Sequence, residues 1–274
     1  MGESRDGCEA VRLNGMMETV CLFLVGVCGG FANAVAGGAS LMSLPVLLWV
    51  GLPVPAAIAT NKLATSGQTI LAAFRYHRAS HFSLAVFLKV ITPFAIGALG
   101  GSLLLLELPE SLLKWVVGGV LVFALALTLS PRKQESELEE GRGEPNPHLT
   151  RIGGMGIGLY GGFFGGGVGL LLVPLLNRFY RLDWLTANGV KAGIAAVMNG
   201  IALAVFLLRD WMSDTSSGGS ESLLQWSIGL PLLAGMLFGA YGGVQFAVKK
   251  GDAWVRAALI LATAASLFML FWKD

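Results

Sequence analysis

Charge is scarce in this sequence. Charged residues make up 13% of the 274 residues, whereas 54% are hydrophobic. A soluble domain carries about 25% charged residues, so a chain this poor in charge cannot cover a water-facing surface. Lipid is therefore the expected solvent for most of it. The formal net charge of +2 is too small to indicate nucleic-acid binding.

Cysteines and intramembrane acids are also few. Cys8, Cys21 and Cys28 lie near the N-terminus, in a pattern that fits neither a disulfide framework nor a metal site, and we expect buried packing thiols. His77 and His81 have the spacing of metal ligands, but they lie among arginines and are interpreted as interfacial anchors. The apolar segments contain no catalytic constellation and almost no carboxylates. We therefore predict neither an enzyme nor a bound metal or cofactor.

Apolar stretches fall into two groups of five. A spanning helix needs about 20 mostly apolar residues. The first group covers about 17–36, 39–50, 56–75, 82–106 and 111–130, and the second about 152–165, 168–177, 186–208, 223–248 and 253–272. The predicted organisation is an N-terminal tail (1–15), a membrane repeat (16–130), a polar, proline-containing linker (131–151) and a second membrane repeat (152–273).

The two groups repeat one pattern. GGASLMSLP (37–45) aligns without gaps with GGVGLLLVP (166–174), and the same offset brings Lys62 onto Lys191. Matches between apolar residues arise easily in such a sequence, but lysine is rare inside membrane segments. The lysine match therefore indicates an internal duplication.

Loop charges predict how the two repeats are oriented. The basic connections are 75–81, 131–151, 178–183 and 249–252, and the acidic or neutral ones are the N-terminus, 51–55, 107–110 and 209–222. All basic connections share one side, expected to be cytoplasmic, if each glycine-containing segment returns to the side it entered. We therefore predict an all-α polytopic protein of the bacterial cell membrane, with two inverted repeats. Each repeat is a glycine-tipped broken helix or hairpin plus three transmembrane helices, about eight transmembrane segments in total.

The repeated glycine pairs predict an anion site. In a hairpin, each pair forms a turn near the middle of the bilayer, and a helix begins there with unpaired N–H groups and partial positive charge. Two such helix starts facing each other could bind an anion. Ser40 adds a hydroxyl in the first copy, where the second has Gly169. Alternatively, the glycines only pack helices closely, as we interpret Gly97/Gly101 and Gly235/Gly239.

Two lysines lie about two turns inside apolar helices. Lys62 and Lys191 have no acid within a helical turn, and an unpaired lysine there costs several kcal/mol. The partner is a bound anion, a helix C-terminus or the interface reached by snorkelling, and all three remain open. Neighbouring amides and hydroxyls favour a polar cavity, and Asn61, Thr65 and Gln68 share a helix face.

These segments resemble the TauE/SafE sulfite exporter family. The resemblance rests on AVAGGASLMSLPVLL (34–48), ATNKLATSGQTILAAFRY (59–76), GGFFGGGVGLLLVPLL (161–176) and ANGVKAGIAAVMNGIALAVF (187–206). It covers almost the whole chain outside the tail and the linker. The resemblance implies a multi-pass transporter built from two repeats that moves sulfite, sulfonates or related sulfur oxyanions. The first tip, AGGAS, departs from the longer glycine run of many members.

The expected function is secondary transport of a small anion, most readily a sulfur oxyanion, by alternating access. The predicted substrate-binding residues are Gly37, Gly38, Ser40, Asn61, Lys62, Thr65, Gln68, Gly166, Gly167, Lys191 and Asn199. The alternatives are a transporter or channel for a carboxylate or neutral metabolite, and a non-transporting scaffold. The expected partners are the substrate anion and the lipid bilayer, with no nucleic acid, and the glycine pairs leave a homo-oligomer open.

Overall fold

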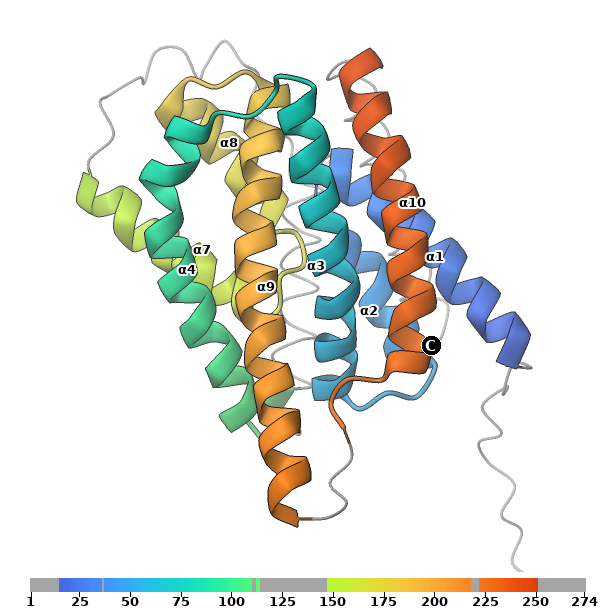
Figure 1. Cartoon of the computed structure of the whole chain (residues 1–274). Helices are drawn as coiled ribbons and strands as arrows, with labels where there is room; N and C mark the ends of the chain where they lie inside the picture. Colours follow the sequence, from blue (N-terminus) through green and yellow to red (C-terminus); the bar gives the residue numbers. More distant parts are fainter. Residues whose placement is uncertain (1–14, 36, 110–111, 114–146, 218–221, 251–274) are drawn as a thin grey trace, which may run out of the picture.

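A computed structural model describes residues 15–35, 37–109, 112–113, 147–217 and 222–250. Across these ranges the chain is helical and contains no strand. The helices of the first half are α1 (Gly15–Val35), α2 (Ala39–Trp49), α3 (Val54–Arg78) and α4 (Leu84–Glu107). Those of the second half are α7 (Pro147–Phe163), α8 (Val168–Tyr180), α9 (Trp184–Ser217) and α10 (Trp226–Lys250). Figure 1 shows them as a bundle.

Eight of the ten predicted apolar segments correspond to these helices. The predicted segments 111–130 and 253–272 lie outside the described residues, apart from 112 and 113. Helix α7 begins at Pro147, so the last five residues of the predicted linker, 147–151, are helical. The N-terminal tail and the rest of the linker also lie outside the described residues.

The exterior of the bundle suits a lipid environment. Four helices, α1, α4, α9 and α10, are long and apolar enough to cross a membrane. Large apolar side chains are exposed on them, for example Leu88, Ile96 and Phe238. Exposing so much apolar surface to water is unfavourable, whereas in lipid it carries no cost. The chain is therefore a polytopic helical membrane protein.

Glycines allow two pairs of helices to approach closely. In α10, a methyl group added at Gly235 or Gly239 would lie 2.1 Å from Phe23 O or 2.0 Å from Val27 O of α1. In α4, Gly97 and Gly101 contact the backbone of α7 in the same way. The close-packing role predicted for these glycines is confirmed.

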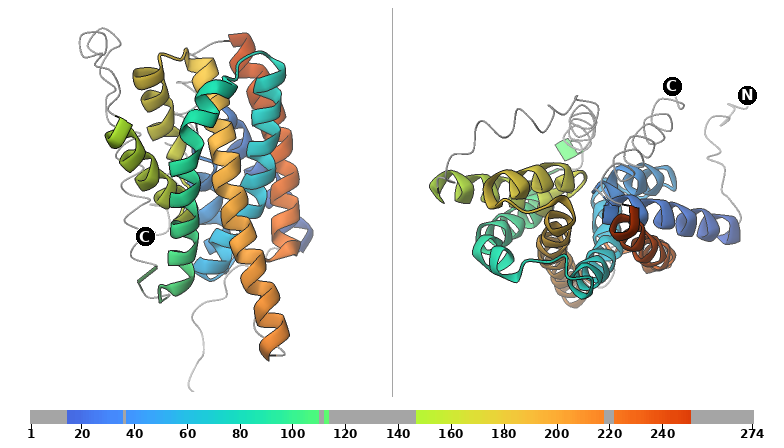
Figure 2. Two further views of the ribbon diagram at one scale, coloured as in Figure 1. Left: turned by 60° about the vertical axis from the view of Figure 1, so that its left-hand side comes forward. Right: turned by 90° about the horizontal axis from the view of Figure 1, so that it is seen from above.

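The helix pairs connect the two halves of the chain. Helices α1 and α10 pack on one flank and α4 and α7 on the other, with α3 and α9 side by side between them (Figure 2). Each flank therefore joins a helix from the first half to one from the second. Corresponding helices run in opposite directions in Figure 1: α3 runs up and α9 down, while α4 runs down and α10 up.

Both glycine tips interrupt a helix. Helix α1 ends before Gly37 and Gly38, whose φ angles are 99° and 123°, and α2 begins at Ala39, the residue at which a new helix was predicted to begin. Helix α7 is followed by Gly165 and Gly167, with φ angles of 82° and 75°, and then by α8. Glycine adopts such angles without strain. In Figure 1, α1 enters from below and α2 runs back down, whereas α7 enters from above and α8 runs back up.

The described basic connections lie at one end of the bundle. The end of α3 with its arginines, the 181–183 turn and the end of α10 with Lys249 and Lys250 are all at the top of Figure 1. The turn between α2 and α3, the end of α9 and the start of α10 are at the opposite end. These positions agree with the predicted distribution, whereas the N-terminus and most of the linker, which also entered that prediction, lie outside the described residues.

The cysteine prediction was wrong for Cys28. Its side chain is exposed and that of Cys21 is half-buried, and Cys8 lies outside the described residues. The buried positions of α1 include Gly26 and Gly30, where close packing against α10 leaves no room for a larger side chain. Cys28 consequently lies away from the packed face.

Candidate functional site

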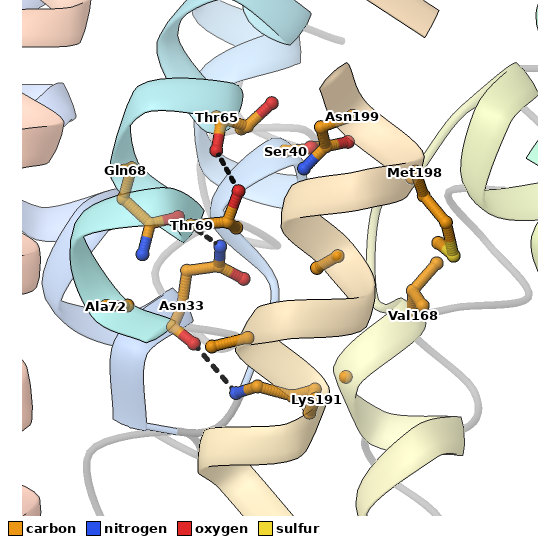
Figure 3. A pocket seen from close by; sticks show the side chains of 14 residues that line it. Asn33, Ser40, Thr65, Gln68, Thr69, Ala72, Val168, Lys191, Met198 and Asn199 are labelled. Carbon is orange, nitrogen blue, oxygen red and sulfur yellow. Dashed lines mark hydrogen bonds between the residues drawn. The ribbon is translucent and has the colours of Figure 1, made fainter. Parts of the chain in front are cut away.

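A small cavity lies between α3 and α9, beside both helix breaks (Figure 3). It is lined by Asn33, Ser40, Thr65, Gln68, Thr69, Ala72, Gly165, Val168, Gly169, Lys191, Ala192, Ala195, Met198 and Asn199. The space open to the centre of a water molecule is about 30 Å³, enough for about two waters. Most of the polar residues come from the first half of the chain, and most of the apolar ones come from α8 and α9.

Five of the predicted site residues line this cavity. They are Ser40, Thr65, Gln68, Lys191 and Asn199. The other six, Gly37, Gly38, Asn61, Lys62, Gly166 and Gly167, do not line it but build the structure next to it. No group of three or more His, Cys, Asp or Glu side chains that could hold a metal ion occurs in the described part of the chain.

Lys191 is buried at one end of the cavity, with 4% of its surface exposed. Its ammonium group donates to the backbone oxygen of Asn33 at 2.9 Å and to Asn188 Oδ1 at 2.8 Å. Asn33 lies in the last turn of α1, where the helix dipole places partial negative charge. Lys191 from the second half therefore interacts with the broken helix of the first half.

Lys62 makes the reciprocal connection. It is 1% exposed, and its ammonium group donates to the backbone oxygen of Gly161, near the end of α7, and to Asn199 Oδ1 at 3.0 Å. Of the three partners considered for the lysines, the structure has the helix C-terminus. Snorkelling is excluded for both, because neither side chain reaches the surface.

Other side chains fix the two helix breaks. The backbone oxygens of Ala34 and Val35 accept hydrogen bonds from Tyr76 Oη at 2.8 Å and Asn188 Nδ2 at 2.9 Å. These carbonyls at the end of α1 would otherwise lack intrahelical partners. In the second break, Tyr160 Oη donates to the backbone oxygen of Gly166.

Asn61 connects α3 to the start of α2. Its Nδ2 donates to Ser40 Oγ at 2.8 Å, and its Oδ1 accepts from Ser43 Oγ at 2.6 Å. All three side chains are buried. Asn61 does not line the cavity, but its hydrogen bond fixes the position of Ser40, which does.

The tips of the two broken helices touch. A methyl group added at Gly37 would lie 2.7 Å from Gly169 Cα. The glycines are therefore needed both for the positive φ angles of the turns and for the close approach of the two backbones. The interpretation that the glycines only pack helices is therefore incomplete, and anion binding at the tips stays a prediction. Gly169, where the first repeat has Ser40, allows this contact.

Asn33 is a cavity residue that sequence reasoning missed. Its Oδ1 accepts from Gly38 N at 3.1 Å, and its Nδ2 donates to Gln68 Oε1. It therefore joins the first tip to α3. The available signal was an amide in an otherwise apolar stretch, FANAVAGG (31–38). Thr69 also lines the cavity and follows Thr65 by four residues, the spacing of one helix face.

A multi-pass helical membrane protein with a buried polar cavity at two broken helices has the architecture of membrane transporters. The chain belongs to the TauE/SafE family: the family model described as "Sulfite exporter TauE/SafE" matches residues 22–270. It is thus a membrane transporter of this family and a multi-pass protein of the cell membrane.

The chain is also similar to curated bacterial proteins over nearly its full length. It is 27% identical to the probable membrane transporter protein YfcA of Escherichia coli (strain K12), over 92% of this chain and 89% of that protein. It is 27% identical to the probable membrane transporter protein ORF9 of Sinorhizobium sp, over 89% and 88%. For a probable membrane transporter protein of Haemophilus influenzae, the identity is 26% over 88% and 89%. No solved structure gives a significant match.

Proposed function

We propose that this protein is a secondary transporter of a small anion, namely sulfite, an organosulfonate or a related sulfur oxyanion. The observation that carries the proposal is the buried ammonium group of Lys191 at a polar cavity between two helix breaks. A buried positive charge with no acidic partner is costly, and an anion in the cavity would balance it. The family description adds sulfite as the first candidate.

The N-terminal ends of the helices that follow the two breaks also favour a negatively charged ligand. Ser40 in the first turn of α2, and Val168 and Gly169 in the first turn of α8, line the cavity. The first N–H groups of a helix have no intrahelical acceptor and carry partial positive charge. An anion between the two starts would interact favourably with both.

Transport itself requires that the cavity open alternately to either side. We propose that the halves are inverted repeats and that they rock against each other about the cavity. The opposite directions of α3 and α9, and of α4 and α10, support this arrangement (Figure 1). The lysine contacts between the halves are then the polar interactions that such a movement has to rearrange.

A transporter of a carboxylate or a neutral metabolite is the second candidate. It is favoured by the amides and hydroxyls that line the cavity, since these groups also bind uncharged polar solutes. It is also favoured by the two acceptors that already bind the ammonium group of Lys191.

Solute uptake by the purified protein in liposomes tests the proposal. Liposomes loaded with unlabelled sulfite should accumulate radiolabelled sulfite, and external sulfite or a small sulfonate should compete. A neutral polar metabolite should not compete, and protein-free liposomes set the background. Uptake that only a carboxylate or a neutral solute inhibits would replace the proposal with the second candidate.

A further inference from the structure

Lys62 and Lys191 occupy equivalent places in the two repeats but differ in their relation to the cavity. Lys191 lines it, whereas Lys62 does not. Gly165, which does line the cavity, lies against the ammonium group of Lys62: a methyl group added there would be 2.6 Å from Nζ. Lys62 is therefore placed to act on the cavity through its neighbours.

The neighbour that Lys62 controls is Asn199. An ammonium group can only donate hydrogen bonds, so it selects the oxygen of the Asn199 carboxamide, Oδ1, at 3.0 Å. The amide nitrogen must then point the other way. In Figure 3 the nitrogen of Asn199 is on the side of α3 and its oxygen is on the opposite side.

The second pair of a lysine and an asparagine, Lys191 and Asn188, is arranged differently. Lys191 likewise binds Asn188 Oδ1, but Asn188 Nδ2 donates to the backbone oxygen of Val35 at 2.9 Å. Asn188 does not line the cavity, whereas Asn199 does. Among the described residues, none accepts a hydrogen bond from Asn199 Nδ2. Its two N–H groups are thus available to a ligand.

We propose that Lys62 is a positioning residue: it fixes the Asn199 carboxamide so that two N–H donors face the cavity. This rests on the proposed function, in which the cavity holds an anion. Oxyanion oxygens only accept hydrogen bonds, so a fixed pair of donors favours them. A rotated Asn199 would instead present its carbonyl oxygen and repel them. Lys62 therefore contributes to selectivity without contacting the substrate.

A double-mutant cycle on sulfite binding tests the proposal. Lys62→Met replaces the lysine with an unbranched apolar chain, and Asn199→Ala removes the carboxamide. Each single variant should weaken the Kd roughly ten- to a hundredfold, the effect of losing a hydrogen bond to a charged group. The double variant should be no weaker than Asn199→Ala, because Lys62 has nothing left to orient. Effects that multiply would show that Lys62 acts on the anion independently, and would overturn the proposal.

Asn199→Asp provides a second test, which does not depend on whether the Lys62→Met variant folds. The aspartate keeps an acceptor for Lys62 and replaces the donors at the cavity with an acceptor, so sulfite should bind more weakly than to Asn199→Ala. Sulfite binding at least as tight as in Asn199→Ala would overturn the proposal. If folded wild-type protein does not bind sulfite, the proposed function itself is contradicted. If wild type binds and Asn199→Ala is unaffected, only the positioning role fails.

Discussion

At the scale of single residues, the two buried lysines raise the question of how their charges are tolerated. Each ammonium group donates to a backbone oxygen in the last turn of a broken helix and to one asparagine oxygen. Helix ends supply partial negative charge without a carboxylate. Such a partner neutralises a lysine less completely than an acid does, and at Lys191, which lines the cavity, this leaves positive charge for an anion.

Gly165→Ala should disturb the site through Lys62. The added methyl group would lie 2.6 Å from Lys62 Nζ and 3.1 Å from the backbone oxygen of Gly161, at a φ of 82° that disfavours alanine. We expect a loss of about 1–3 kcal/mol in stability, seen as a lower midpoint of thermal unfolding in detergent.

Gly200→Ala is the matched control for that variant. An added methyl group at Gly200 meets nothing within 4 Å, so its midpoint should equal or slightly exceed that of wild type because alanine favours helix. Equal midpoints for the two variants would refute the contact between Gly165 and Lys62.

At the scale of helices, the packing between α1 and α10 makes a matched pair of substitutions informative. Gly239→Ala would place a methyl group 2.0 Å from the backbone oxygen of Val27, whereas one at Gly242 meets nothing within 4 Å. Because backbone atoms cannot move aside, Gly239→Ala should force the helices apart and lower the unfolding midpoint. Gly242→Ala should leave it unchanged. If both variants matched wild type, the close approach of α1 and α10 would be wrong.

The start of α9 gives a pH dependence. Partial burial raises the pKa of Asp183, but hydrogen bonds from Thr186 and the charge of His81 outweigh it, so the pKa lies below its ordinary value. A lowered pKa means that the ionised carboxylate stabilises the fold above its unfolded pKa, and that this contribution is lost as the pH falls through the folded pKa.

Asp183→Asn should test this contribution. The Asp183 carboxylate accepts from Thr186 N at 3.1 Å, and asparagine can accept the same bond but has no charge. Wild type should be more stable than Asp183→Asn by about 0.5 kcal/mol at pH 7, and the difference should shrink as the pH falls below the ordinary aspartate pKa of about 3.9. Thermal unfolding across this pH range measures it. A difference that stays constant with pH would contradict the role of the charge.

The sequence predicted the positions of the helices better than it predicted which helices and side chains contact each other. The glycine pairs located both breaks, because glycine adopts positive φ without strain, although at the second break the positive φ angles are those of Gly165 and Gly167 rather than of the predicted pair Gly166 and Gly167. The spacing of Gly235 and Gly239 identified a packing face but not the helix it faces, because a small residue fits any close neighbour. The sequence likewise predicted that Lys62 lies inside an apolar helix, but not that it binds Asn199, which lies in the second half of the chain.

At the scale of the whole molecule, helices and lysines of each half contact the other half. Each flank pairs a helix of one half with a helix of the other, and each lysine binds the broken helix of the opposite half. The cavity therefore depends on both halves together. The proposed movement of one half against the other would change the lysine contacts and the cavity at the same time.

The central claim is that this shared cavity binds an anion through Lys191. The most direct measurement is calorimetric binding of sulfite, sulfate, thiosulfate, a small sulfonate, a carboxylate and chloride to wild type, Lys191→Gln and Lys89→Gln. Lys89 is an exposed lysine of α4 and serves as the control. The account predicts saturable binding of a sulfur oxyanion by wild type and Lys89→Gln, weakened at least tenfold in Lys191→Gln. Binding unchanged in folded Lys191→Gln, or absent for every anion in folded wild type, would contradict it.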